Sequence, residues 1–311
     1  MYITMDEGER RELDTLLRGI RAQVHSHPEL SNREFETTKL VQRHLAALGL
    51  EPVELGLPTG AAALLRGGRP GPTVGLRADL DALPVTEQTG APYGSENEGV
   101  MHACGHDVHT SVLLGAAELL TKRREEIAGN ILFLFQPAEE AMVGARHVVE
   151  QGLFQRVKLS ALLGMHVWPQ LPRGEVGLRA GAFFAAVDNF RIVIAGRGGH
   201  GSTPNLSRSP IGAGAALALA IPAIKAYDLP PTEPATVAVT LLQAGDCNNV
   251  IPDACELQGT IRTFSEEARH IVAQRLQELT RSTAAAWGCT GEAEISKGTP
   301  PLVNDEGLEQ V

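Results

Sequence analysis

Hydrophobic residues recur along this chain at two spacings, that of a helix and that of a strand. The helical spacing comes first. Apolar residues recur at helical spacing between Leu13 and Val24, which predicts a first helix. Ser31 and Glu34 form the pattern of a capping box, so a second helix is predicted to start there and to run to Gly49.

Short apolar segments then alternate with helical ones up to about residue 166. Strands are predicted at 61–65, 73–76, 130–135 and 161–166, and helices at 110–122 and 141–150. Such alternation is typical of the α/β class, in which a mostly parallel sheet is covered by helices on both faces.

The pattern changes near residue 183. Phe190, Ile192 and Ile194 alternate with other residues as in a half-buried strand. The elements that follow are predicted as a helix at 211–226, strands at 236–243 and 256–264, a long helix at 266–287 and a strand at 292–296. This β-α-β-β-α-β order is that of a ferredoxin-like α+β domain. We therefore predict a second domain at 183–297, inserted into a first domain formed by 1–182 plus 298–311.

The composition of the chain argues against several classes of protein. The chain has 311 residues, 43% of them hydrophobic, and a formal net charge of −10. Net negative charge argues against nucleic acid and anionic membranes as partners. The sequence contains no apolar stretch of transmembrane length and no apolar signal core near Met1, which predicts a cytoplasmic protein. The spacing of the four cysteines does not indicate a disulfide framework.

Residues 101–109 contain one thiol, three imidazoles and a carboxylate, a set that favours a metal site. Cys104 and His106 lie two residues apart and can reach one ion from an irregular loop. His109 lies near the predicted helix start and is expected to orient a ligand by hydrogen bonding.

Acids and a further histidine follow the predicted strands. Asp79 and Asp81 come after strand 73–76, Glu139 and Glu140 follow strand 130–135, and His166 ends strand 161–166. Ligands of open α/β sheets bind at the carboxyl ends of the strands, so a shared site is predicted there. Taken separately, the two glutamates also fit a solvated helix start, and His166 fits a core histidine.

The other histidines and the glycines carry less information. His25, His27, His44, His147 and His270 lie on predicted helices and are expected at the surface. Residues 196–201 fit the GxGxxG pattern, but no acid follows before Asp228, so a dinucleotide site is not expected. The glycines instead predict a tight loop that presents His200. The chain contains no GxSxG motif, which counts against a serine hydrolase.

The motifs together resemble the N-acyl-amino-acid amidohydrolases, the group of hippurate hydrolase and indoleacetyl-amino-acid hydrolase. These enzymes are relatives of aminoacylase and of dinuclear-metal carboxypeptidases. The matching segments are HSHPELSNREFETT (25–38), LRADLDALPVTEQTG (76–90), MHACGHDVHT (101–110), FQPAEE (135–140), GMHVWPQLPRGEVGLRAG (164–181), GRGGHGSTP (196–204), GDCNNVIPD (245–253) and GTIRTF (259–264). They cover nearly the whole chain in the family's order.

The resemblance implies a dinuclear-metal catalytic domain that binds two divalent ions, for which zinc, manganese, cobalt and nickel are all compatible. The ligands that it implies are Cys104, His106, Glu140 and His166, with Cys104 bridging the ions. Glu139 is implied as the general acid and base, and Asp79 and Asp81 are expected to support the ligands by hydrogen bonds.

The resemblance also implies that 1–182 plus 298–311 form the catalytic domain, and that the inserted domain at 183–297 is a lid that forms a homodimer. His200 is implied to reach the active site of the partner subunit and to stabilise the tetrahedral oxyanion. Asn249 and Arg262 are implied to bind substrate, because an arginine pairs with a carboxylate in bidentate fashion. Family members continue beyond residue 311 and carry a final histidine ligand there, whereas no histidine follows His270 in this chain. We therefore expect the catalytic domain to be incomplete at its C-terminal end.

The expected activity is metal-dependent hydrolysis of the amide of a small-molecule N-acyl-amino acid. A carboxypeptidase or dipeptidase on the same scaffold is the alternative in the same class. A non-catalytic binding protein that keeps the fold is the alternative in another class.

Overall fold

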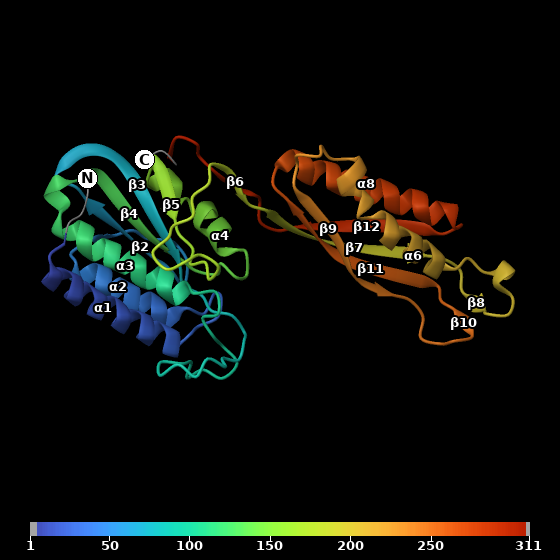
Figure 1. Cartoon of the computed structure of the whole chain (residues 1–311), viewed down its shortest axis with the longest axis horizontal. Helices are drawn as coiled ribbons and strands as arrows, with labels where there is room; N and C mark the ends of the chain where they lie inside the picture. The colour runs from blue at the N-terminus through green and yellow to red at the C-terminus, as the bar shows by residue number, and fades with distance from the viewer. Residues whose placement is uncertain (1–4, 309–311) are drawn as a thin grey trace. The chain divides into compact units, whose positions relative to one another are not determined.

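The computed structural model describes residues 5–308, which form two compact units that divide between Pro172 and Arg173 (Figure 1). The first unit contains a five-stranded sheet in the order β1-β2-β4-β3-β5. Its strands are β1 (Glu51–Pro52), β2 (Ala61–Arg66), β3 (Arg69–Asp79), β4 (Ala128–Gln136) and β5 (Ala161–Gly164). The predicted α/β class is confirmed.

The strands that lead to the predicted site are the parallel ones. β4 and β5 both pair with β3 in parallel, whereas β2 pairs antiparallel with β4 and with β1. In this register Asp79 lies opposite Gln136, and Arg77 lies opposite Gly164. The carboxyl ends of β3, β4 and β5 therefore meet at one edge, and the residues that follow them are held close together.

Helices cover both faces of this sheet. α1 (Glu7–Ser26), α2 (Phe35–Ala47) and α3 (His106–Lys122) contribute to one buried core. The short helices α4 (Gly144–Glu150) and α5 (Leu153–Arg156) contribute to the other. Successive residues of a strand point to opposite faces, so Leu65 packs in the first core and Leu64 in the second.

The capping box expected at Ser31 and Glu34 is not present. The Ser31 hydroxyl donates a hydrogen bond to Asp81, and the buried Glu34 carboxylate accepts one from the backbone of Ala138, so neither caps α2. The capping box lies at the start of α1, where Asp6 and Glu9 exchange hydrogen bonds with each other's backbone. Ser31 and Glu34 therefore bond distant residues, Asp81 and Ala138, instead of the backbone at the start of α2.

The second unit contains an antiparallel sheet in the order β12-β7-β11-β9. Its strands are β7 (Ala186–Ala195), β9 (Ala235–Gln243), β11 (Ala254–Thr263) and β12 (Thr290–Lys297), and its helices are α6 (Pro210–Ala220), α7 (Ala223–Tyr227) and α8 (Glu266–Ala286). Apolar side chains of the helices and of alternate strand residues form one core. The ferredoxin-like topology predicted for the lid is confirmed.

Smaller elements complete the described chain. β6 (Gly181–Phe184) pairs with β13 (Leu302–Asn304), and β8 (Gly199–His200) pairs with β10 (Val250–Ile251). The 3-10 helices are η1 (Arg124–Glu126) and η2 (Pro204–Leu206). Assignment of 1–182 plus 298–311 to a catalytic domain and of 183–297 to a lid stays a prediction. Within residues 5–308, every helix is too short or too polar to cross a membrane.

Asp188 and Arg269 form a buried ion pair that joins β7 to α8. The Arg269 guanidinium donates to both carboxylate oxygens of Asp188, at 2.6 and 2.7 Å, and the backbone N–H of Gly298 donates to the same carboxylate at 2.9 Å. The side chains of Asp188 and Arg269 are 2% and 7% exposed, so solvent cannot replace a lost partner.

We predict that Asp188→Ala lowers the free energy of unfolding of the second unit by about 3–5 kcal/mol, because it leaves the buried Arg269 charge with only the exposed carboxylate of Glu266 as an ion-pair partner. Denaturant unfolding followed by circular dichroism measures this loss. Glu256→Gln, which removes an exposed pair with Arg191, serves as the control and is expected to cost less than about 1 kcal/mol. Equal losses in the two variants would contradict the prediction.

Candidate metal centre

Gly105 gives the loop before α3 the geometry that brings Cys104 and His106 to one point. Its φ is +88°, in the left-handed region that glycine adopts without strain. A Cβ at this position would lie 2.5 Å from the Val167 side chain, so the close approach to the segment after β5 also requires glycine. The Cys104 Sγ and the His166 Nε2 are 3.4 Å apart as a result.

The two glutamates are placed by a strained loop after β4. Ala138 is buried and has φ +51°, a conformation that a non-glycine residue adopts only under constraint. The Glu34 carboxylate accepts a hydrogen bond from the Ala138 N–H at 2.7 Å, and the Gly144 N–H donates to the Ala138 carbonyl at 3.0 Å. The loop therefore turns sharply and presents Glu139 and Glu140 at the sheet edge.

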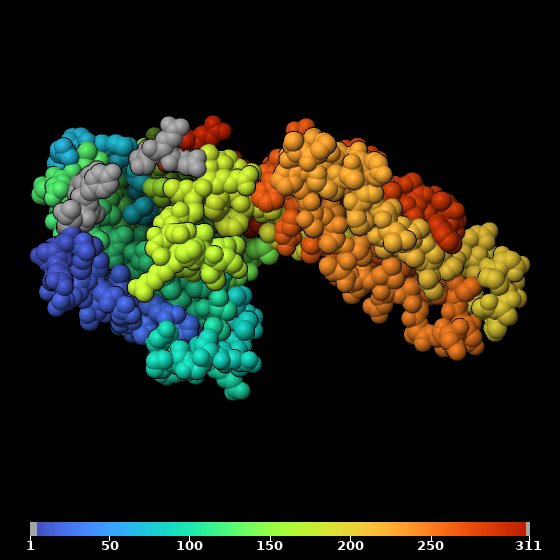
Figure 2. Space-filling view, in the orientation of Figure 1, coloured from blue at the N-terminus to red at the C-terminus, as the bar shows by residue number. Residues whose placement is uncertain are grey.

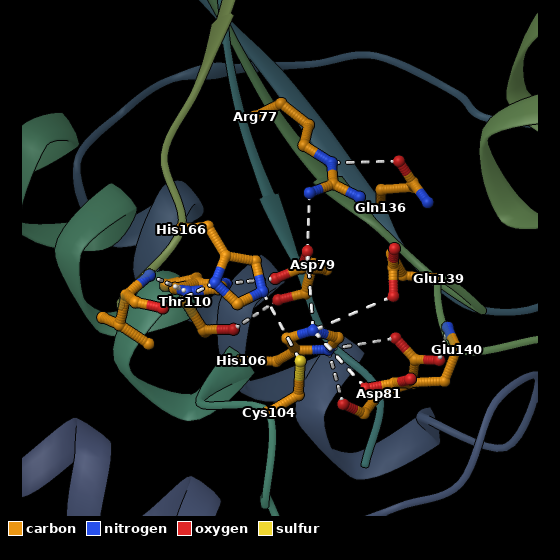
Figure 3. Close-up of polar contacts among 12 residues, drawn as sticks. Arg77, Asp79, Asp81, Cys104, His106, Thr110, Gln136, Glu139, Glu140 and His166 are labelled. Atoms are coloured by element: carbon orange, nitrogen blue, oxygen red, sulfur yellow. Dashed lines mark hydrogen bonds and ion pairs between the residues drawn. The ribbon is translucent and has the colours of Figure 1, made fainter. Parts of the chain in front are cut away.

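His106 lies at the centre of the cluster and is completely buried (Figure 3). Its Nδ1 donates to the backbone carbonyl of Asp81 at 2.8 Å, so in the neutral imidazole the lone pair lies on Nε2. That Nε2 lies 3.7 Å from an oxygen of Asp79, 3.8 Å from one of Glu140 and 4.0 Å from one of Glu139.

Asp79 and His109 form a fixed hydrogen-bonded chain behind the cluster. The Val167 N–H donates to His109 Nε2 at 2.9 Å, so the proton of this imidazole is on Nδ1, which donates to Asp79 at 2.6 Å. Both ring nitrogens of His109 are occupied, which fits the predicted orienting role better than that of a ligand. Asp81 accepts hydrogen bonds from the Ser31 hydroxyl and the Glu140 N–H.

The cluster has a strongly negative environment. Burial alone would lower the pKa of His106, but the surrounding acids, Asp81 first, raise it to about 11. Hydrogen bonds with His106 and His166 lower the pKa of the Cys104 thiol. Burial raises the pKa of Asp79, yet His109 and the charge of Arg77 lower it well below its usual range. Burial raises the pKa of Glu139, as suits a proton-transferring group.

This cluster fits divalent cations on its own chemistry. His106 Nε2 and Glu140 Oε1 are buried without a hydrogen-bond partner among the described residues, and such atoms are costly unless a ligand satisfies them. Three ligand groups have their donor atoms within 4.8 Å of one another: Cys104, His106 and His166; Asp79, His106 and His109; and His106, Glu139 and Glu140. Thiolate, imidazole and carboxylate are the donor set that zinc-like ions prefer.

The three predicted lid residues belong to the second unit. Pairing of β8 with β10 brings His200 next to Asn249, whose carbonyl accepts a hydrogen bond from the Gly201 N–H at 2.8 Å. Both residues are exposed. Arg262 is half-buried towards the other end of β11, so it is not grouped with them. The roles of all three stay predictions.

The sequence did not reveal several residues around the centre. Arg77 donates to Asp79 at 2.5 Å and to Gln136 at 3.0 Å, which fixes the Asp79 carboxylate (Figure 3). His25 was expected at the surface, and this expectation was wrong, because the residue is 4% exposed and bonds Asp107. His25 lies four residues after Arg21, which places both side chains on one face of the helix, and Arg21 bonds the same carboxylate. This spacing was the signal in the sequence that could have identified His25.

The fold and the centre define the class of this chain, a metal-dependent hydrolase of amide bonds whose second unit is ferredoxin-like. The family model described as peptidase family M20/M25/M40 matches residues 75–311. The chain therefore belongs to this family.

Individual relatives agree with that assignment. An N-acetylcysteine deacetylase of Bacillus subtilis is 42% identical over 292 residues, which cover 94% of this chain and 76% of the relative. Thermostable carboxypeptidase 1 of Saccharolobus solfataricus is 40% identical over 306 residues, which cover 97% of this chain and 77% of the relative. The crystal structure of a dinuclear metal binding peptidase of the M20 family from Bacillus subtilis has a TM-score of 0.86 at 39% identity, covering 96% of this chain and 78% of that one.

We predict that His106→Ala removes at least one of about two bound ions per chain, because His106 belongs to all three groups of candidate ligands. Elemental analysis after dialysis measures the loss, and far-ultraviolet circular dichroism checks the fold. His270→Ala, at an exposed position on α8, is the matched control and should leave metal content unchanged. Full metal loading of the His106 variant would overturn this prediction.

Proposed function

We propose that this protein hydrolyses N-acyl-amino acids to a carboxylic acid and a free amino acid. The observation that carries the proposal is the centre itself, in which His106 is shared by one group with Cys104 and His166 and by another with Glu139 and Glu140. The side chain of Glu139 stays part-exposed. The similarity to N-acetylcysteine deacetylase supports an N-acyl substrate. The similarity to thermostable carboxypeptidase 1 keeps peptides as the competing substrates.

In this proposal Cys104, His106, Glu140 and His166 would hold two divalent ions. Zinc, manganese, cobalt or nickel suits this donor set. Bound ions polarise a carbonyl and lower the pKa of water to about 7. Asp79 and His109 fix the arrangement, because their hydrogen bonds to Arg77 and Val167 leave them one orientation.

Glu139 moves the proton in this mechanism. Its carboxylate takes a proton from the water that attacks the acyl carbonyl, and the same carboxyl group then donates the proton to the nitrogen of the leaving amino acid. The raised pKa of Glu139, caused by burial, favours this double role near neutral pH. The carbon–nitrogen bond breaks as the nitrogen accepts the proton, so no charged amide ion is released.

The lid residues complete the proposal. His200 donates a hydrogen bond to the negative oxygen of the tetrahedral intermediate of a partner subunit, and Asn249 and Arg262 bind the substrate carboxylate. The exposure of His200 on β8 and of Asn249 in the turn just before β10 supports contact with a second chain. This arrangement requires a homodimer.

A substrate panel tests the proposed function. The protein, loaded in turn with manganese and zinc, is assayed against acetyl- and benzoyl-amino acids and against dipeptides of the same amino acids. Hydrolysis of the acyl-amino acids with the higher kcat/KM is expected. A preference for dipeptides would replace the proposal by the peptidase function, and metal binding without any hydrolysis would replace it by a binding function.

We predict that Glu139→Gln lowers kcat by about 10²- to 10⁴-fold, the usual contribution of a positioned acid-base group. Metal content should stay at the wild-type level, since the variant keeps the four proposed ligands. Glu150→Gln, at an exposed position of α4, is the control and should keep wild-type kcat. Normal turnover in the Glu139 variant would remove this residue as the proton carrier.

A further inference from the structure

A pocket of about 490 Å³ opens directly beside the metal centre, within the first unit. Cys104 and His166 line it on the side of the centre, and Arg21 and His25 line it elsewhere. Its volume lies in the range of about 300–1,000 Å³ that is typical of pockets for whole small molecules. An acetyl group would leave most of this space empty.

Apolar and aromatic side chains line much of the pocket. They are Tyr93, Met101, Val108, Val167 and Trp168. A chain of methylene groups or a ring that leaves the centre would contact these side chains and lose water, which stabilises binding. The lining therefore favours an acyl group that is longer than acetyl.

The Arg21 side of the pocket is a rigid polar structure. The Arg21 Nε donates to Asp107 at 2.7 Å, and the guanidinium carbon lies 4.5 Å from the centre of the Tyr93 ring. His25 bonds the same oxygen of Asp107 at 2.8 Å and bonds Glu87 at 3.2 Å. Fixed through Nε and stacked on a ring, the guanidinium still has terminal N–H groups for a ligand.

The segment around Tyr93 is held to the end of α1. Glu87 accepts a hydrogen bond from the Ser95 N–H at 2.6 Å, the Glu96 N–H donates to the Ser26 carbonyl at 2.8 Å, and the Asn97 side chain donates to the Pro28 carbonyl at 2.9 Å. Residues 84–100 form the teal projection at the lower edge of the first unit in Figure 2. These contacts fix the pocket wall that carries Tyr93.

His102 gives a second, independent sign of a ligand. This residue lines the pocket, is 4% exposed, and has no hydrogen-bond partner at either ring nitrogen among the described residues. A buried imidazole normally satisfies at least one nitrogen, because leaving it without a partner costs the desolvation of that group. A polar group of a bound molecule, or water, would supply the missing partner.

The charges near this part of the pocket favour an uncharged ligand group. The positive charge of Arg21 is matched by that of Asp107, and Glu87 adds a second negative charge on the far side of His25. A carboxylate would therefore meet no excess of positive charge, whereas an amide or hydroxyl oxygen would accept from Arg21 without repulsion.

We propose that this pocket is the acyl-group subsite, and that it selects acyl chains whose far end carries an uncharged hydrogen-bonding group which Arg21 and His102 recognise. This assignment rests on the proposed N-acyl-amino acid hydrolysis. Arg21 is a specificity-determining residue in this view, and it takes no part in the proton transfers.

The test uses the full metal-loaded protein and one amino acid carrying four different acyl groups. Three of them are acetyl, glutaramoyl and glutaryl. The fourth is a hydrocarbon isostere, a branched acyl group that has the shape of glutaramoyl and glutaryl but ends in methyl groups. The kcat/KM for glutaramoyl is expected to exceed that for the hydrocarbon isostere by about 10- to 100-fold, as hydrogen bonds to a charged group allow. Glutaryl is expected to fall below glutaramoyl.

Variants test whether the preference for glutaramoyl depends on Arg21. Arg21→Met should lower the ratio of kcat/KM for glutaramoyl to that for the isostere about tenfold or more, with most of the change in KM. A general loss of structure would lower both rates and leave this ratio unchanged. Arg18→Met, on an exposed turn of the same helix, is the matched control and should keep the ratio of the wild type.

The outcomes separate the two proposals. Hydrolysis of the acetyl substrate without discrimination between glutaramoyl and its isostere would overturn the subsite assignment and leave the proposed function standing. Preference for glutaryl would overturn the argument from charge and with it the uncharged ligand. Absence of hydrolysis of all four acyl-amino acids, with dipeptides cleaved, would overturn the proposed function itself.

Discussion

The carboxyl ends of three parallel strands meet at one edge of the first unit, and this constraint governs everything else in the centre. The register of β3 with β4 and β5 brings four carboxyl groups, from Asp79, Asp81, Glu139 and Glu140, around a single buried imidazole. Negative charges at such short distances repel one another in a medium of low polarity. A divalent cation relieves this repulsion and satisfies the buried His106 and Glu140 atoms that have no partner in the described chain.

The supporting contacts show how the fold tolerates that repulsion. Arg77 pairs with Asp79, Ser31 and the Glu140 backbone bond Asp81, and the strained Ala138 loop is held by Glu34. These contacts hold the acids in place, and most of them join segments that are far apart in the sequence. The same organisation continues outward from Asp107, which follows His106 directly and bonds Arg21 and His25 at the adjoining pocket. The centre and the pocket therefore share one connected framework.

Much of the fold was predictable because burial leaves a regular trace in the sequence. Strands that are covered on both faces appear as continuous apolar segments, as in β4, while the half-covered β7 alternates. The spacing of Cys104, Gly105 and His106 predicted a pair of ligands from one loop. Arg77 was missed because its position two residues before Asp79 does not show that the two side chains bond. His25 was missed because its partner Asp107 lies 82 residues away, and the spacing from Arg21 shows only that the two side chains share a helix face. The capping box at Ser31 was misplaced for the same reason.

The sequence by itself determined the order of helices and strands, the two-part organisation and the set of residue types able to bind metal, since these follow from periodicity and from side-chain chemistry. Only the tertiary structure decided which of those residues share a centre, which nitrogen of His106 is left for an ion, and that a pocket with a polar part adjoins it. Such features depend on strand register and on long-range hydrogen bonds. They arise only when distant segments pack together.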